Sequence, residues 1–262
     1  MASKRELLEL QQTLYESKNA TRRWLHCSRR DWIIDAIRRY LPPGKKRALE
    51  IGPGAGIYLP VLASLFDEVT AMDIENVYLE HAQRLTALHP NLALVADDIT
   101  CSRLPDDSFD LILCSEVIEH LSAPDTALRE MRRLLSPAGI LILSTPQRHS
   151  TIELAARVAF MPGIVNLVRM IYGEAVLEMG HISLMSAKEI SACLEASGFH
   201  LLERFKSGLY LPFIAEFMGA AALRVESRLE GLFRRSSLLS NLLWTQYFVV
   251  QAGKRQKGKF YE

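Results

Sequence analysis

The sequence is poor in the features that mark several classes of protein. It has only four cysteines, no two of which form a Cys-x-x-Cys pair, so we expect neither a disulfide scaffold nor a cysteine zinc site. Only 14 glycines and 11 prolines occur among 262 residues, which excludes fibrous and low-complexity classes. The first residues lack the apolar core of a signal peptide, and the longest apolar stretch is interrupted by Pro212 and Glu216. These absences predict a cytoplasmic protein without a membrane span.

The chain also lacks an excess of charge of one sign, because it contains 31 Lys and Arg and 30 Asp and Glu. The balance hides a division along the chain: the net charge is +7 over residues 1–47, −9 over residues 48–253 and +3 over residues 254–262. Basic ends around an acidic body are typical of proteins that contact an anion, such as a phosphate, a carboxylate, a nucleic acid or a lipid surface. Solvated faces and a basic tail are the alternative interpretation.

Short apolar runs alternate with amphipathic stretches between residues 47 and 146. Strands that alternate with helices of this length form βαβ units around a parallel sheet that is buried on both faces. The predicted strands are Ala48–Ile51, Val69–Ile74, Ala93–Ile99, Asp110–Ser115 and Gly139–Thr145. The predicted helices between them are Ile57–Phe66, Val77–Leu88 and Asp125–Leu135. The fold class is therefore α/β.

The elements beyond this alternation are helices and two further strands. Ser186-Ala-Lys-Glu189 is a capping box, which predicts a helix that begins there and ends at Gly198. The segments Phe199–Phe205 and Trp244–Val250 have the composition of strands.

The same patterns predict one main domain with additions. Residues 1–40 are expected to form an N-terminal helical extension or lid, and residues 41–253 the domain itself. Apolar helical inserts at 151–180 and 209–236 interrupt that domain, and residues 254–262 form a basic tail.

A glycine-rich loop follows the first predicted strand. In Glu50-Ile-Gly52-Pro-Gly54-Ala-Gly56, alternate glycines allow a tight turn and let the backbone approach a ligand. The spacing is G-x-G-x-G rather than the G-x-G-x-x-G of pyrophosphate-binding loops. A carboxylate at Glu50 would repel a pyrophosphate, whereas it suits a cationic ammonium group. The loop alone could still be a simple turn.

Two further acidic positions follow the next two strands. Asp73 lies 23 residues after Glu50, where an acid can accept hydrogen bonds from both ribose hydroxyls. Asp98 and Ile99 end the third strand, where a carboxylate and a backbone N–H can recognise an adenine edge. Each acid alone could be a helix cap or a solvated turn residue. Together with the glycine loop, they indicate a nucleoside with a positively charged tail, which fits S-adenosylmethionine better than a nicotinamide cofactor.

These segments resemble the class I S-adenosylmethionine-dependent methyltransferases over roughly residues 45–253. The family also typically has a sequence like Pro105-Asp-Asp-Ser-Phe-Asp-Leu-Ile-Leu-Cys-Ser-Glu-Val-Ile-Glu-His-Leu121. The resemblance extends to proteins of the methyltransferase type 11 and ubiquinone-biosynthesis O-methyltransferase kind. It implies a Rossmann-like, doubly wound sheet of seven strands whose last strand is antiparallel.

The resemblance also implies a cofactor site at the ends of four strands. Its residues are Glu50, Gly52, Gly54 and Gly56 at the methionine part, Asp73 and Ile74 at the ribose, Asp98 and Ile99 at the adenine, and Cys114 and Ser115 along the pocket wall. Asp97 stands where relatives often have glycine, so the choice between Asp97 and Asp98 for adenine recognition stays open.

Methyl transfer to an oxygen needs the acceptor's proton removed by a base or acidified by a metal. His120 and His181 are the candidate catalytic histidines. Glu116, Glu119, His120 and His181 also resemble a divalent-metal set in two methyltransferase subfamilies, which methylate ubiquinone precursors and the terminal 2′-hydroxyl of small RNAs. The alternative is a site without metal, where Glu119 caps or is solvated and His120 touches the substrate or packs.

The apolar inserts and the N-terminal extension suggest the kind of acceptor. They predict a dry pocket for a hydrophobic or lipid-linked small molecule, or a contact with a membrane surface; core packing is the alternative. Arg22, Arg23, Arg29 and Arg30 could bind an anionic group of the substrate. We therefore expect O-methylation of a quinone, polyketide or lipid-type molecule. An RNA 2′-O-methyltransferase and a non-catalytic cofactor-binding subunit are the rival hypotheses, although an RNA-binding module is missing.

Overall fold

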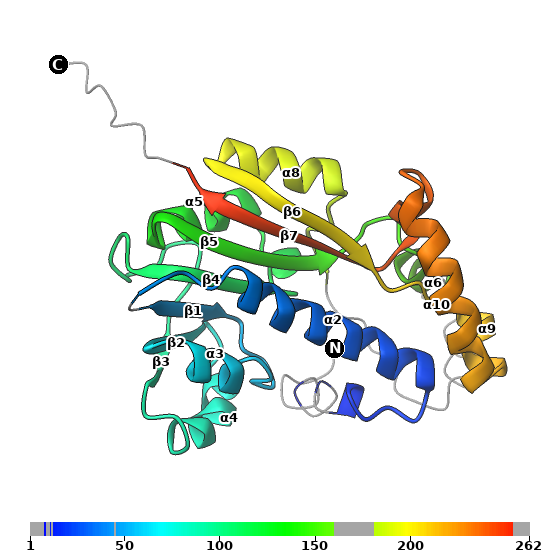
Figure 1. Ribbon diagram of the computed structural model, residues 1–262, viewed down its shortest axis with the longest axis horizontal. Helices are drawn as coiled ribbons and strands as arrows, with labels where there is room; N and C mark the ends of the chain where they lie inside the picture. Colours follow the sequence, from blue (N-terminus) through cyan, green and yellow to red (C-terminus); the bar gives the residue numbers. More distant parts are fainter. Residues whose placement is uncertain (1–7, 9–10, 12, 45, 160–180, 254–262) are drawn as a thin grey trace.

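The computed structural model describes residues 8, 11, 13–44, 46–159 and 181–253. Its centre is a seven-stranded sheet of order β3-β2-β1-β4-β5-β7-β6 (Figure 1). The strands are β1 (Arg47–Ile51), β2 (Glu68–Asp73), β3 (Leu92–Ala96), β4 (Phe109–Ser115), β5 (Leu135–Pro146), β6 (Phe199–Ser207) and β7 (Thr245–Ala252). Strands β1 to β5 run parallel, and β7 is antiparallel to both of its neighbours. This confirms the predicted Rossmann-like fold with an antiparallel last strand.

Two apolar layers cover the faces of the sheet, because side chains alternate along each strand. One layer contains Leu49 and is covered by η1 (Ile118–His120), α5 (Pro124–Leu134) and α8 (Ala187–Ala196). The other contains Ala48 and is covered by α2 (Ala20–Arg39), α3 (Leu59–Leu65) and α4 (Asn76–Thr86). The sheet is therefore buried on both sides, which explains its nearly continuous apolar strands.

Helix α2 belongs to this core rather than standing apart from it. Asn19 caps its start, where the side-chain oxygen accepts hydrogen bonds from the backbone N–H groups of Thr21 and Arg22. Its buried face packs against the last strand in the chain: the ring of Trp32 lies 4.4 Å from that of Tyr247. Helix α2, which is part of the predicted N-terminal extension, therefore packs against β7.

The predicted boundaries are correct to within a few residues, with one larger difference. The capping box at Ser186 and Glu189 begins α8 as expected. Strand β5 begins at Leu135 instead of Gly139, because Leu135 already pairs with Phe109 before an irregularity in the ladder. Of the predicted insert 151–180, residues 151–159 form α6 (Thr151–Ala159), and the remainder lies outside the described residues.

The second insert contains α9 (Pro212–Phe217) and α10 (Ala220–Arg235), and η2 (Leu239–Leu242) follows it. Two acids of α10 are buried and hold the chain that leaves β6. Glu230 accepts hydrogen bonds from the N–H groups of Gly208 and Leu209, and Glu226 accepts one from that of Leu211. Across the described ranges, no helix has both the length and the apolar character needed to cross a bilayer.

Candidate functional site

A cavity of about 110 Å³ lies at the carboxyl ends of β1 and β4, where ligands bind in open α/β sheets. The glycine loop forms one wall. Gly52 and Gly54 have φ values of 66° and 50°, and a Cβ at Gly52 would lie 2.5 Å from the side chain of Val117. Gln11, Leu14 and Tyr15 of the N-terminal segment also line the cavity. Part of the predicted extension thus faces the glycine loop.

Glu50 is one of the charged residues that line this cavity. Its side chain is 2% exposed, and Oε2 has no hydrogen-bond partner in the described part of the chain. Burial raises the pKa of Glu50 to about 8. A buried carboxyl group without a partner is costly, so this arrangement is suited to a cationic group that enters the cavity.

The second predicted acid, Asp73, ends β2, and its Oδ1 accepts a hydrogen bond from the N–H of Glu75. This bond fixes the turn that leads into α4. Ile74 follows with a side chain that is 63% exposed. The two residues predicted at the ribose thus lie at the sheet edge that bears the glycine loop.

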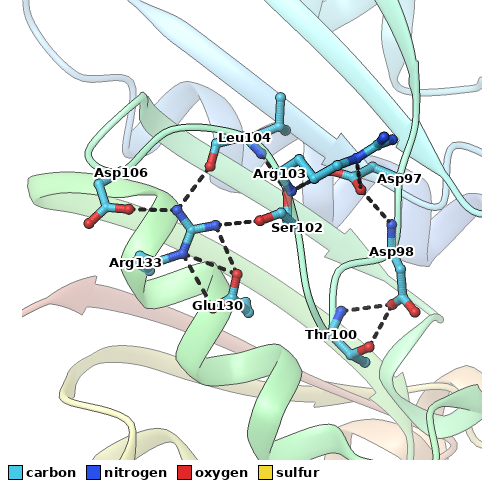
Figure 2. Close-up of polar contacts among 9 residues, drawn as sticks. All are labelled: Asp97, Asp98, Thr100, Ser102, Arg103, Leu104, Asp106, Glu130 and Arg133. Carbon is cyan, nitrogen blue, oxygen red and sulfur yellow. Dashed lines mark hydrogen bonds and ion pairs between the residues drawn. The ribbon is translucent and has the colours of Figure 1, made fainter.

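Asp97 and Asp98, the two candidates for adenine recognition, lie in the loop after β3 (Figure 2). The carboxylate of Asp97 accepts hydrogen bonds from the Oγ of Ser102 and the backbone N–H groups of Arg103 and Asp98. Burial alone would raise the pKa of Asp97, but these hydrogen bonds hold it below its ordinary value. Asp97 is therefore used to shape the loop.

Asp98 uses only one of its two oxygens within the described structure. Its Oδ1 accepts hydrogen bonds from the N–H and Oγ1 of Thr100, each at 2.8 Å. Ile99 is buried in the core beside it. The arrangement leaves Oδ2 of Asp98 for a ligand and so favours Asp98 over Asp97 as the adenine-binding acid.

Arg133 of α5 stabilises this loop from below (Figure 2). It donates hydrogen bonds to the carbonyl oxygens of Ser102 and Leu104 and forms ion pairs with Asp106 and Glu130. The loop that carries Asp97 and Asp98 is thereby held to the helix on one face of the sheet.

The two residues predicted to line the pocket at the end of β4, Cys114 and Ser115, lie in different surroundings. Ser115 lines the cavity, and its Oγ lies 2.9 Å from the Oγ of Ser144. Cys114 is fully buried in the apolar core and does not line the cavity, because alternate residues of a strand face opposite sides. That Cys114 contacts the cofactor therefore stays a prediction, which this cavity does not support.

Arg29, one of the four arginines that the sequence suggested for an anionic group, is buried and lines the cavity. Its Nη1 lies 2.6 Å from Oε2 of Glu116, and its guanidinium lies 5.2 Å from the centre of the Trp244 ring. Its Nη2 also lies 3.3 Å from Nδ1 of His26. Glu116 is further held by the Oγ of Ser144 and has a φ of 58°. A spacing of four residues from Leu25 to Arg29 and on to Ile33 places Arg29 on the buried face of α2.

Three of the four predicted metal ligands come together, and Glu116 is not among them. The ligand atoms of Glu119, His120 and His181 lie within 4.8 Å of one another. Glu119 is fully buried; Thr145 donates to its Oε2, while Oε1 has no hydrogen-bond partner among the described residues and lies 3.9 Å from Nε2 of His120. Burial and the nearby Glu116 raise the pKa of Glu119.

The segment that carries His181 is fixed to η1, which follows β4. The N–H groups of Ile182 and Ser183 both donate to the carbonyl oxygen of Glu119. Nδ1 of His181 lies 3.3 Å from Oε1 of Glu153 in α6, an arrangement that orients the ring. The group can therefore offer one carboxylate and two imidazoles to a divalent ion, a donor set that suits a first-row metal.

A family model described as a methyltransferase domain matches residues 23–204, which contain the glycine loop, the three acids and the Glu119–His181 group. The chain belongs to this methyltransferase family. Its sequence and sheet topology are those of the class I S-adenosylmethionine-dependent methyltransferases.

Two curated relatives of this methyltransferase are ubiquinone biosynthesis O-methyltransferases. The mitochondrial protein of Schizosaccharomyces pombe is 31% identical over 128 residues, which are 47% of this chain and 46% of the relative. The protein of Alkalilimnicola ehrlichii is 34% identical over 107 residues, 40% of this chain and 43% of the relative. The chain thus matches less than half the length of each.

Solved structures agree with the methyltransferase fold. An S-adenosylmethionine-dependent methyltransferase from Archaeoglobus fulgidus superposes with a TM-score of 0.55 at 17% identity, over 85% of this chain and 94% of that one. The [4+2]-cyclase SpnF gives a TM-score of 0.56 at 18% identity, over 85% of this chain and 80% of that one. Because that protein is named a cyclase, the fold by itself does not identify the reaction.

Proposed function

We propose that this methyltransferase transfers a methyl group from S-adenosylmethionine to an oxygen atom of a hydrophobic small molecule. The observation that carries the proposal is the buried carboxyl of Glu50, which lines the cavity beside the glycine loop and whose Oε2 has no hydrogen-bond partner among the described residues. When bound, S-adenosylmethionine supplies an electrophilic methyl group on its sulfonium. Everything else in the reaction is positioning and proton removal by this chain.

The residues at the strand ends would bind the cofactor in three parts. Glu50 would accept the ammonium of the methionine part, while the glycine loop lets the backbone approach closely. Asp73 would accept hydrogen bonds from the ribose hydroxyls, and Oδ2 of Asp98 one from the adenine amino group. This division is supported by the free oxygens of Glu50 and Asp98 and by the engagement of Asp97 within its own loop.

The group of Glu119, His120 and His181 supports oxygen as the accepting atom. His120 has an exposed side chain and could accept the proton of a hydroxyl group directly. A divalent ion held by the same three residues could instead acidify that hydroxyl. We propose the metal-assisted form, because Oε1 of Glu119 has no hydrogen-bond partner among the described residues and lies 3.9 Å from Nε2 of His120.

The names of the relatives and the cover of the site support a hydrophobic acceptor. Both relatives are O-methyltransferases of ubiquinone biosynthesis. Leu14 and Tyr15 close one side of the cavity, where they would exclude water from the reacting atoms. We therefore propose that residues 1–40 serve as a lid as well as a structural element, and that the acceptor is a phenol-like or lipid-linked molecule.

Calorimetric titration with S-adenosylmethionine and a methylation assay test the proposal together. We expect micromolar binding by the full chain, about −8 kcal/mol, weakened at least tenfold in Glu50→Gln. Glu80→Gln, an exposed carboxylate of α4, is the matched control and should bind normally. Radiolabelled methyl transfer to an extract of apolar metabolites, and not to RNA, is the expected result. Methylation of RNA alone, or binding without any transfer, would overturn the acceptor assignment.

A further inference from the structure

The outward face of α10 carries charge of one sign only. Helix α10 contains two acids and four arginines, but Glu226 and Glu230 are buried and bonded to the backbone of residues 208–211. The charged residues that remain exposed are Arg224, Arg228, Arg234 and Arg235. Arg234 pairs with Glu230. The other three form no ion pair with any residue that the structure describes.

Apolar side chains lie directly beside these three arginines. Val225 and Leu232 are both exposed, Leu232 by 58%, and a spacing of seven residues places them on one side of the helix. Arg224, Arg228 and Arg235 follow the same helical spacing on the adjoining stripe. The helix therefore presents an apolar stripe and a basic stripe next to each other.

Exposed apolar side chains also occur just beyond both ends of the helix. Phe217 and Met218 precede α10 and are exposed, Phe217 by 71%. Leu238 and Leu239 follow it and are exposed as well, Leu238 by 76%. Figure 1 shows α9 and α10 at the margin of the molecule, beyond the ends of β5 and β6. We call this set of residues, 217–239, the α10 surface.

We propose that the α10 surface docks on an anionic lipid bilayer, with its arginines at the headgroup phosphates and its apolar side chains in the acyl boundary. The alternation of exposed arginine with exposed leucine, valine and phenylalanine matches the layered chemistry of that interface. A second copy of this chain fits less well, because a twofold contact would bring like charges together. A soluble polyanion would give no reason for the exposed apolar side chains. This inference is independent of the proposed function.

Vesicle sedimentation with the full chain tests the proposal. We expect binding to vesicles of phosphatidylcholine with phosphatidylglycerol, little binding to phosphatidylcholine alone, and weaker binding at high salt. The triple variant Arg224→Gln, Arg228→Gln, Arg235→Gln should lower the partition coefficient on the order of 100-fold, given the usual contribution of each basic residue. The matched control is Arg38→Gln, Arg84→Gln, Arg129→Gln, which removes three exposed arginines from α2, α4 and α5; its binding should fall far less.

A second variant, Val225→Gln with Leu232→Gln, tests the apolar stripe without changing charge. Both positions are exposed, so circular dichroism and melting temperature should remain those of the parent chain. We expect this variant to bind anionic vesicles at least tenfold more weakly. Equal loss in the two arginine variants, or no effect of the apolar variant, would overturn the proposal. So would dimerisation that is lost with the same substitutions, or equal binding to a soluble polyanion such as RNA.

Discussion

The guanidinium of Arg29 lies 2.6 Å from the carboxylate of Glu116, although the two residues are 87 positions apart in the sequence. The contact ties the middle of α2 to the turn after β4. Both side chains are largely buried and line the same cavity as Glu50. Glu116 adopts a left-handed backbone conformation there, which a non-glycine residue keeps only when its surroundings hold it.

Replacing Arg29 alone should lower the free energy of unfolding more than replacing both residues of this ion pair. Arg29→Met leaves the carboxylate of Glu116 buried without its cation, at a cost of about 3 kcal/mol. Glu116→Gln should cost less, because the amide still accepts hydrogen bonds. The double variant should recover part of the loss, since no unpaired charge remains. Urea denaturation of all four proteins measures the coupling; strictly additive changes in the free energy of unfolding would contradict the pairing.

The pKa of Glu50 predicts a pH-dependent stability. Because burial raises the pKa of this carboxyl from 4.5 to about 8, the folded chain retains a proton that the unfolded chain loses. The free energy of unfolding should therefore fall as the pH rises through this window, by up to about 1.4 kcal/mol per pH unit. Glu50→Gln should abolish that part of the slope, and denaturation at several pH values measures it.

Cofactor binding should reverse the protonation of Glu50. An ammonium group beside the carboxylate lowers its pKa, so binding near pH 7 should release a proton. Calorimetry in buffers of different ionisation enthalpy counts that proton, and affinity should rise between pH 6 and pH 8. In Glu50→Gln the proton release should disappear. A release that persists in this variant would assign the proton to another group.

Substitutions at Asp97 and Asp98 should have different effects: one on the melting temperature, the other on cofactor affinity. Asp98→Ala should weaken S-adenosylmethionine binding, by about 1.5–3 kcal/mol for a charged hydrogen bond, with a small change in melting temperature. Asp97→Asn should lower the melting temperature more, because the carboxylate receives hydrogen bonds from Ser102, Arg103 and Asp98. Calorimetry and thermal denaturation on the same samples separate the two effects. The opposite pattern would assign the adenine to Asp97.

Chelation should abolish methyl transfer if the metal-assisted form is correct. We expect activity to vanish in chelator and to return with Mn²⁺ or Mg²⁺. His120→Ala should lose Mn²⁺ binding, measured by paramagnetic resonance, whereas Glu116→Gln should retain it because Glu116 lies outside the group. His200→Ala, which alters an exposed histidine of β6, is the surface control. Full activity in chelator would leave His120 as a lone base.

Deletion of residues 1–16 tests the lid without removing the cap of α2. Ser17 and Asn19 remain, so the helix should still form. Because Gln11, Leu14 and Tyr15 line the cavity, turnover should fall steeply and cofactor affinity should fall with it. Normal turnover per folded molecule would show that the segment is no lid. Melting temperature, measured on the same sample, reports any purely structural loss.

The alternation of strands with helices and the glycine-rich turn after β1 could be predicted because their signals are local. Apolar runs, a capping box and glycines at fixed spacing are consequences of backbone geometry within a few residues. The left-handed φ of Gly52 and the start of α8 at Ser186 are examples that the structure confirms.

Long-range partners could not be predicted in the same way. Nothing in the sequence distinguishes Arg29 from the neighbouring arginines at positions 22, 23 and 30. Its ion pair with Glu116, 87 residues away, is visible in the structure alone. Glu116 was expected to act with Glu119, His120 and His181, but a positive φ turns it toward Arg29. Likewise, nothing local indicates that Glu226 and Glu230 bind the backbone of residues 208–211.

The contact between α2 and β7 has a consequence for how the site is made. Trp32 packs on Tyr247, and Arg29 lies over Trp244, so the first described helix completes its packing only against the last strand. During synthesis, the helix that carries Arg29 must wait until more than 200 further residues have left the ribosome. Nascent chains stopped before β7 should therefore hold an exposed Trp32, and binding competence should arise late and in a single step.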